Sequence, residues 1–112
     1  MKKEKLTKEE EVVLKLNKNK IIIGIPKETS FQEDRICLSP ESVGVLTSDS
    51  ITIFIEEGAG LGANFSDSDY SENGAVIASS SDVYKKSNLI LKVEPPTIEE
   101  VKLMKENQIL IS

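Results

Sequence analysis

Residues 21–40, IIIGIPKETSFQEDRICLSP, contain an apolar run, a charged loop and the start of a helix, in that order. Four isoleucines around one glycine at 21–25 predict a buried strand, because β-branched side chains pack well on a pleated sheet. Pro26 ends that strand, since proline has no N–H to donate to a neighbouring strand. Ser39 and Pro40 fit the N-cap and the first position of a helix. Ligands of parallel sheets lie beyond the carboxyl ends of the strands, so the intervening loop is a candidate site.

The rest of the chain repeats this alternation of apolar strands and capped helices. Further strands are predicted at 51–55, 75–78, 88–94 and 108–111, and helices at 40–47, 67–73, 82–86 and 98–106. A strand, a helix and a strand in succession require a crossover connection, which makes the two strands parallel. The predicted fold class is therefore α/β, with a mostly parallel sheet of about five strands and helices on both faces, Rossmann-like or flavodoxin-like.

The helices of this prediction need an apolar side that faces the sheet. We expect Val43 and Leu46 to be buried in the helix at 40–47, and Val101 and Met104 in the helix at 98–106.

The amino terminus differs in composition from the remainder. Residues 1–20 carry seven lysines and four glutamates, whereas residues 21–112 carry seven basic and fifteen acidic side chains. Thr7 followed by Glu10 is a capping-box pattern, so we predict a short helix over 8–16. We divide the chain into a helical appendage at 1–19 and one domain at 20–112, incomplete at its carboxyl end.

Composition excludes several kinds of function. An acidic chain with a net charge of −5 and no basic stripe argues against nucleic acid as a partner. The chain has no histidine and one cysteine, Cys37, which excludes an intramolecular disulfide, a Cys/His metal cluster and a histidine-based triad. We expect Cys37 to be buried as a small apolar residue. No apolar run approaches the roughly 20 residues of a membrane-spanning helix, and the charged start is unlike a signal peptide, so we expect a cytoplasmic location.

Two cations occupy unusual positions in this pattern. Arg35 lies in the loop after the first predicted strand, and Lys92 lies near the carboxyl end of another. In a parallel sheet both side chains reach the same edge, where they suit a small 2-oxo acid: a guanidinium binds a carboxylate bidentately and an ammonium also donates to a carbonyl oxygen. Structural alternatives are a Lys92 amine that extends to water and an ion pair of Arg35 with Glu33, Asp34 or Glu28.

Two carboxylates that follow predicted strands, Glu28 and Glu94, are the best placed to orient Lys92 or Arg35. No pair of carboxylates is fixed on one face for acid/base chemistry, so we assign no catalytic residue.

A glycine-rich segment at 58–63, GAGLGA, matches the G-x-G-x-x-A dinucleotide pattern directly after a predicted strand. A pyrophosphate loop opens onto free N–H groups at a helix N-terminus. The next predicted helix begins with Asp67 and Asp69, whose carboxylates would repel a phosphate. We therefore assign no cofactor-binding residue to this segment.

Three segments, in this order and at these separations, resemble the N-terminal domain shared by alanine dehydrogenase and the alpha subunit of pyridine nucleotide transhydrogenase: IGIPKETSFQEDRICLSP, IEEGAGLGANFSDSDYSENGA and NLILKVEPP. The resemblance covers about residues 20–112. For alanine dehydrogenases it implies reversible NAD-linked oxidative deamination of L-alanine to pyruvate and ammonia. It also implies that Arg35 and Lys92 hold the carboxylate and the carbonyl of the substrate.

The same resemblance implies that these residues are part of a larger oxidoreductase. The family's acid/base histidine, catalytic aspartate and Rossmann domain fall after Ser112, so NAD would be bound by a domain outside this chain. The chain would then be a fragment or a truncated product, inactive alone, of a homo-oligomeric enzyme of amino-acid metabolism. Glu94 and Pro95 stand where many alanine dehydrogenases have lysine and glutamate, which leaves the transhydrogenase branch, with its membrane partner, open. A non-catalytic interaction module of the same fold is the other alternative.

Overall fold

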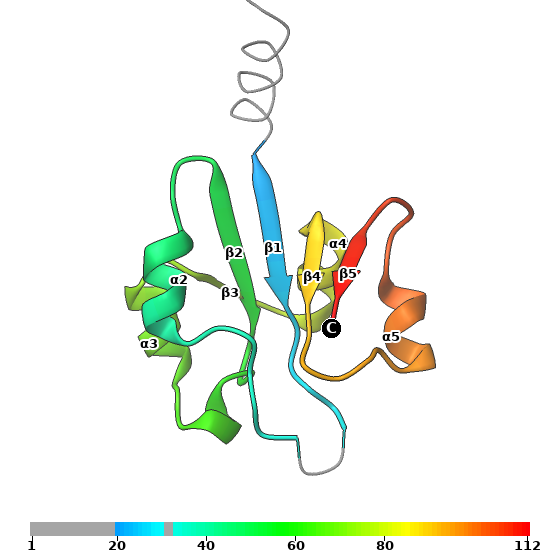
Figure 1. The fold of residues 1–112 in the computed structure, drawn as a ribbon, viewed down its shortest axis with the longest axis horizontal. Helices are drawn as coiled ribbons and strands as arrows, with labels where there is room; N and C mark the ends of the chain where they lie inside the picture. Colours follow the sequence, from blue (N-terminus) through cyan, green and yellow to red (C-terminus); the bar gives the residue numbers. More distant parts are fainter. Residues whose placement is uncertain (1–19, 31–32) are drawn as a thin grey trace, which may run out of the picture.

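The computed structural model describes residues 20–30 and 33–112, and its centre is a five-stranded sheet (Figure 1). The strands are β1 (Ile21–Ile25), β2 (Ile51–Glu56), β3 (Val76–Ala78), β4 (Leu89–Leu91) and β5 (Ile109–Ile111). They lie in the order β3-β2-β1-β4-β5, and every neighbouring pair is parallel. This arrangement confirms the predicted α/β fold class. The helix predicted at 8–16 and the appendage at 1–19 lie outside the described residues.

Four α-helices and one 3-10 turn connect the described strands: α2 (Pro40–Leu46), η1 (Leu61–Ala63), α3 (Asp67–Glu72), α4 (Ser80–Lys86) and α5 (Ile98–Leu103). Each α-helix follows a serine or threonine whose side-chain oxygen accepts a first-turn N–H; these residues are Ser39, Ser66, Ser79 and Thr97. Such caps satisfy N–H groups that a helix leaves without partners, and they mark the predicted starts at 40, 67 and 98. The helix predicted at 82–86 begins two residues earlier, at Ser80, because Ser79 is its cap. Within the described residues, no helix has the length and apolarity needed to cross a bilayer.

The direction of the connections reverses between β1 and β4. From β1 the chain adds β2 and β3 on one side, then returns through α4 and adds β4 and β5 on the other side. The helices α2 and α3 cover one face of the sheet, and α4 and α5 cover the opposite face (Figure 1). In open parallel sheets such a reversal leaves a crevice at the carboxyl ends of the two central strands. The loops after β1 and β4 meet at this point.

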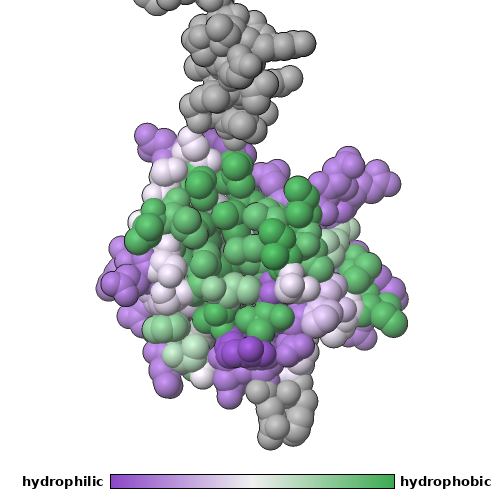
Figure 2. All heavy atoms as spheres, viewed as in Figure 1, coloured by the Kyte–Doolittle hydropathy of each residue, from purple (hydrophilic) through white to green (hydrophobic). Residues whose placement is uncertain are grey.

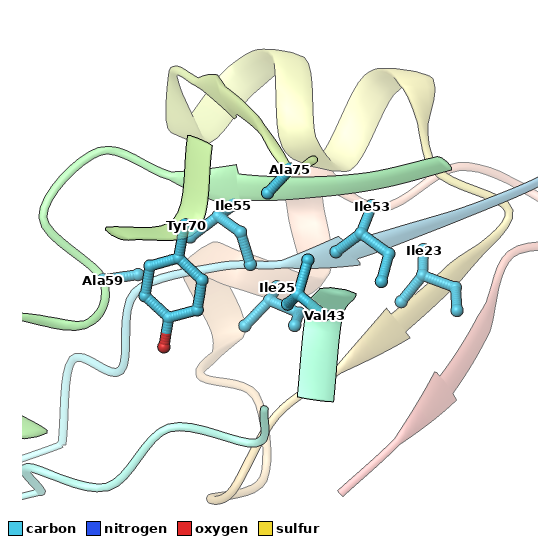
Figure 3. Packing of buried hydrophobic residues seen from close by; sticks show 8 residues of the cluster. All are labelled: Ile23, Ile25, Val43, Ile53, Ile55, Ala59, Tyr70 and Ala75. Carbon is cyan, nitrogen blue, oxygen red and sulfur yellow. The ribbon is translucent and has the colours of Figure 1, made fainter. Parts of the chain in front are cut away.

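The larger core lies between β1, β2 and the helices α2 and α3. Figure 3 shows the side chains that form it: Ile23, Ile25, Val43, Ile53, Ile55, Ala59, Tyr70 and Ala75. Burying one large aliphatic side chain contributes about 1.5–3 kcal/mol, so this cluster is the main source of stability. The Tyr70 hydroxyl donates to the Leu38 carbonyl over 2.7 Å, which ties the loop before α2 to α3.

Two of the predicted buried helix positions are wrong. Val43 is buried and Met104 packs on the smaller core formed by Val83, Tyr84 and Ile90, but Leu46 and Val101 are exposed. Leu46 is the last residue of a two-turn helix, and α5 turns Glu100 rather than Val101 toward the protein. Cys37, which we expected to be buried, is only half-buried.

Two predicted elements are shorter in the structure. The helix at 98–106 ends at Leu103, because the chain turns at Asn107, with a φ of 64°, to place β5 beside β4. The Gln108 side chain holds this turn by donating to the carbonyls of Tyr84 and Ser87, each over 2.7 Å. The strand at 88–94 ends at Leu91.

The sheet face on the side of α2 and α3 is uncovered over β4 and β5. Leu89 and Leu91 point to this face, and Ile109 and Ile111 lie opposite them in register. Ile109 is 61% and Ile111 54% exposed. Figure 2 shows apolar side chains gathered over the middle of this face, where β1, β4 and β5 lie in Figure 1.

Candidate functional site

Lys92 directly follows β4, and its side chain is buried at the reversal point of the sheet, with only 1% of it exposed. Its Nζ lies 3.1 Å from Oε1 of Glu28, in the loop after β1, and 3.2 Å from Oε2 of Glu100, in α5. A charge buried this deeply is tolerated only when it is paired and hydrogen-bonded. The amine does not extend to water, so that alternative for Lys92 is wrong.

Glu28 joins the loop after β1 to the loop after β4. Its carboxylate accepts the Val93 N–H over 2.8 Å and the Glu94 N–H over 3.3 Å, in addition to the Lys92 ammonium. These N–H groups would otherwise continue the ladder of β4. The strand therefore ends earlier than predicted because a side chain of another loop replaces the neighbouring strand as the acceptor.

Glu100 uses its two carboxylate oxygens for different purposes. Oε1 accepts the Thr97 N–H over 2.8 Å, which completes the capping box of α5. Oε2 faces the Lys92 ammonium and accepts the Tyr84 hydroxyl over 3.3 Å. Burial raises the pKa of Glu100, but the Thr97 N–H and the Lys92 ammonium outweigh burial, and the pKa is lowered overall. Burial, with the Glu100 charge beside it, raises the pKa of Tyr84, which keeps the hydroxyl protonated as a donor.

Arg35 lies on the outside of the same edge, with 72% of its side chain exposed. Its Nε donates to Oε1 of Glu33 over 2.9 Å and its Nη2 to Oε2 over 2.7 Å, a bidentate pair. The predicted alternative of an ion pair with Glu33 is thus present. Hydrogen bonding to Arg35 holds the pKa of Glu33 at about 2, and the same pairing raises the pKa of Arg35. A longer contact of 3.5 Å joins Nη2 to Oε1 of Glu94.

Acidic residues link the two cations at this edge. Glu94 contacts Arg35 with its side chain and donates its N–H to Glu28, which in turn pairs with Lys92. The two carboxylates predicted from their positions after strands therefore lie beside the cations: Glu28 contacts Lys92 and Glu94 contacts Arg35. Simultaneous binding of one anion by Arg35 and Lys92 stays a prediction.

A cavity of about 140 Å³ adjoins the ion pairs, between the loop after β1 and the glycine-rich loop after β2. The lining residues are Lys27, Glu28, Glu33, Asp34, Gly58, Ala59, Leu61 and Gly62. It includes the carboxylates that pair with Lys92 and Arg35 but neither of the two cations. The charged side chains that line it are Lys27, Glu28, Glu33 and Asp34.

The glycines of the G-x-G-x-x-A segment allow close packing. A Cβ atom at Gly62 would lie 2.9 Å from Oδ1 and 3.0 Å from Cα of Asp34, and one at Gly60 would press on the Tyr70 ring. Gly58 has a φ of 74°, and its N–H donates to Oδ1 of Asp67 over 2.9 Å. The aspartate at the start of α3 thus occupies an N–H that a phosphate loop would need.

Sequence reasoning missed Tyr84 and the role of Glu100. The Thr97-x-x-Glu100 pattern was a signal for a capping box, and a capping box accounts for one carboxylate oxygen only. Nothing in the local sequence of α4 connects Tyr84 to a residue sixteen positions further on.

Residues 24–112 match the family model described as "Alanine dehydrogenase/PNT, N-terminal domain". The chain is 40% identical over 92 residues to an alanine dehydrogenase of Staphylococcus saprophyticus, a match that covers 82% of this chain and 25% of that protein. It is 35% identical over 92 residues to the NAD(P) transhydrogenase subunit alpha of Haemophilus influenzae, covering 82% of this chain and 18% of the subunit. The chain therefore spans a quarter or less of these relatives.

Solved structures give the same two kinds of relative. An L-alanine dehydrogenase superposes with a TM-score of 0.76 at 42% identity, over 80% of this chain and 25% of the other. A transhydrogenase from Sinorhizobium meliloti superposes with a TM-score of 0.75 at 34% identity, over 80% of this chain and 26% of the other.

Proposed function

This chain belongs to the family of alanine dehydrogenase/PNT N-terminal domains, and we propose that it is the substrate-binding part of an NAD-dependent alanine dehydrogenase. The reaction is the oxidation of L-alanine to pyruvate and ammonia, with hydride transfer to NAD. In this proposal NAD is bound by a separate nucleotide domain, because we assign no cofactor site to this chain. The enzyme acts in the cytoplasm as a homo-oligomer. Several relatives that are named alanine dehydrogenases support the proposal.

The observation that carries the proposal is the buried Lys92 between Glu28 and Glu100 at the reversal point of the sheet. Buried ion pairs contribute little net stability, because removing the charges from water costs about as much as their attraction gains. An arrangement of this kind at the expected ligand crevice is better explained by binding. Lys92 then donates an N–H to the carbonyl oxygen of the 2-oxo acid.

Arg35 supplies the second contact of this proposal. Its bidentate pair with Glu33 uses Nε and Nη2, and it fixes the plane of the guanidinium. Among its contacts in the described part of the chain, none involves Nη1, whose N–H groups remain for the carboxylate of the ligand. The high exposure of the side chain fits a group that is covered only when the rest of the enzyme is present.

A second candidate is the corresponding piece of the alpha subunit of an NAD(P) transhydrogenase. The relatives from Haemophilus influenzae and Sinorhizobium meliloti favour it, since they match nearly the same share of this chain as the alanine dehydrogenases. Glu94, which lies beside Arg35, leaves this candidate open, because the resemblance implies a lysine at its position in many alanine dehydrogenases. In that case the complete protein requires a membrane partner.

A chimeric enzyme tests the proposal. Residues 20–112 replace the matching quarter of the Staphylococcus saprophyticus alanine dehydrogenase, and NADH formation from L-alanine is followed by absorbance. We expect activity, and we expect Arg35→Gln to lower kcat/KM by about 100-fold, since the charge-assisted contact of the guanidinium to the substrate carboxylate is lost. Lys102→Gln, which removes an exposed charge from α5, is the matched control and leaves kcat/KM unchanged.

A folded, NAD-binding chimera without alanine oxidation contradicts the proposal. In that case residues 20–112 are placed in a transhydrogenase alpha subunit instead of the matching segment. Retained hydride transfer between nucleotides in this second chimera supports the second candidate.

A further inference from the structure

We infer that Glu100 and Tyr84 are positioning residues for Lys92, which they hold so that a single N–H of its ammonium is presented to the oxo acid. This inference rests on the proposed role of Lys92 as a substrate ligand. It adds two residues from helices on the face of the sheet opposite to α2 and α3, and neither of them follows a strand.

The Glu100 carboxylate is aimed by three separate contacts. Oε1 is fixed by the Thr97 N–H of the capping box, and Oε2 is fixed by the Tyr84 hydroxyl and the Lys92 ammonium. Tyr84 is itself 1% exposed and packed with Val83 and Ile90, so its hydroxyl has a fixed place. The carboxylate thus has one orientation, set by a helix cap on one side and by the small core on the other.

The fixed Glu100 carboxylate matters because the Lys92 ammonium has a limited number of N–H donors. A lysine ammonium has three N–H donors and no acceptor. One donates to Oε1 of Glu28, in the loop after β1, and one to Oε2 of Glu100, in α5. In the described part of the chain the third has no protein acceptor, so it is the one that a carbonyl oxygen can accept. Loss of either anchor lets the ammonium rotate and exchange its donors.

Helix capping alone does not explain Glu100. A glutamate at the third position of a helix completes a capping box with one oxygen and normally leaves the other in water. The side chain of Glu100 is only 10% exposed, and its second oxygen faces a buried cation and a buried hydroxyl. The second capping box of the structure, Ser66 with Asp69 in α3, has hydrogen bonds to its own cap and no such contact in the described residues.

The test uses the 112-residue chain labelled with ¹⁵N-lysine, in which NMR detects ammonium groups that are protected from exchange with water. In the unchanged chain we expect a protected Lys92 signal. Glu100→Gln retains an oxygen for the Thr97 N–H but places an NH₂ group against the ammonium, so we expect exchange of Lys92 to accelerate by at least about 10-fold. Tyr84→Phe removes one hydroxyl and gives a smaller acceleration. Glu99→Gln removes an exposed charge from the same turn and changes nothing.

Titration with pyruvate separates positioning from a purely structural role. We expect the Kd for pyruvate to rise about 10-fold in Glu100→Gln and to stay constant in Glu99→Gln, while the backbone amide signals of α5 keep their positions. If the exchange rate of the Lys92 ammonium is unchanged in Glu100→Gln, the inference is overturned, whether or not the Kd for pyruvate changes. Accelerated exchange with an unchanged pyruvate Kd also overturns it, because the anchoring would then be structural only. A third outcome is that pyruvate causes no saturable change in the NMR signals of the unchanged chain, while Glu100→Gln still accelerates exchange of Lys92. That outcome counts against the proposed function and not against the positioning role.

Discussion

Lys92 could be selected as a candidate from its residue type and position in the sequence, but its contacts could not be predicted. Its place in an apolar segment just before a loop was enough to select it as a candidate, since lysine is rarely buried without a partner. Its partners come from the loop after β1, sixty-four positions away, and from α5, eight positions away. These carboxylates come together only in the folded chain. Glu28 could be selected because it follows a predicted strand, whereas no sequence pattern indicated that Glu100 turns inward.

The pair of Arg35 and Glu33 makes stability depend on pH in the acid range. The pKa of Glu33 is held at about 2 by Arg35, below the ordinary value of about 4.3, so the pair stabilises the fold above that ordinary value. The contribution is lost as the pH falls toward 2. We expect Glu33→Gln to be less stable than the unchanged chain at pH 6 and equally stable near pH 2, as measured by urea unfolding. A stability difference that is the same at every pH would contradict this account.

The capped helices are the most predictable elements of this chain. Ser39 was expected at a helix start and accepts a first-turn N–H group, and Ser66, Ser79 and Thr97 do the same at the starts of the other α-helices. A cap is a local interaction, so the residues that make it are neighbours in the sequence. The ends of β4 and α5 were placed wrongly, because Glu28 ends the first and the contacts of Gln108 end the second.

The two capping boxes give a matched pair of variants. Thr97→Ala and Ser66→Ala each remove one side-chain acceptor from a first turn, and we expect each to lower the free energy of unfolding by about 1 kcal/mol. Only Thr97→Ala disturbs the helix turn that carries Glu100, so only this variant should accelerate water exchange of the Lys92 ammonium. Denaturant unfolding and NMR measure the two effects. Equal exchange rates in both variants would show that the cap of α5 does not aim Glu100.

For the whole molecule, the strand order explains how much of the site was predictable. Parallel strands send their carboxyl ends to one edge, so Arg35 and Lys92 were expected at the same edge before any contact was known. Glu28 and Glu94 were predicted to orient Lys92 or Arg35, but the chain of contacts that joins the two cations was not predicted. The ion pair of Arg35 with Glu33 was predicted only as an alternative to ligand binding. Long-range pairings of this kind leave no periodic signal, because they join loops and helices that the topology brings together.

The uncovered sheet face predicts how the separate chain behaves. Ile109 and Ile111 expose apolar surface on the edge strand β5, and contiguous apolar areas promote association. We expect the chain to bind a hydrophobic dye and to self-associate as its concentration rises. The double variant Ile109→Lys with Ile111→Lys should reduce both effects at an unchanged fold, whereas Val45→Lys, at an exposed position of α2, should not. Sedimentation velocity measures the association, and a monomeric unchanged chain at all concentrations would contradict the prediction.

The direct test of the account is a crystal structure of the active chimera with pyruvate. We expect one pyruvate at the reversal point between β1 and β4, with its carboxylate within hydrogen-bonding distance of the Arg35 guanidinium and its carbonyl oxygen at Nζ of Lys92. Pyruvate bound elsewhere in the enzyme, with Arg35 and Lys92 still occupied only by Glu33, Glu28 and Glu100, would contradict it.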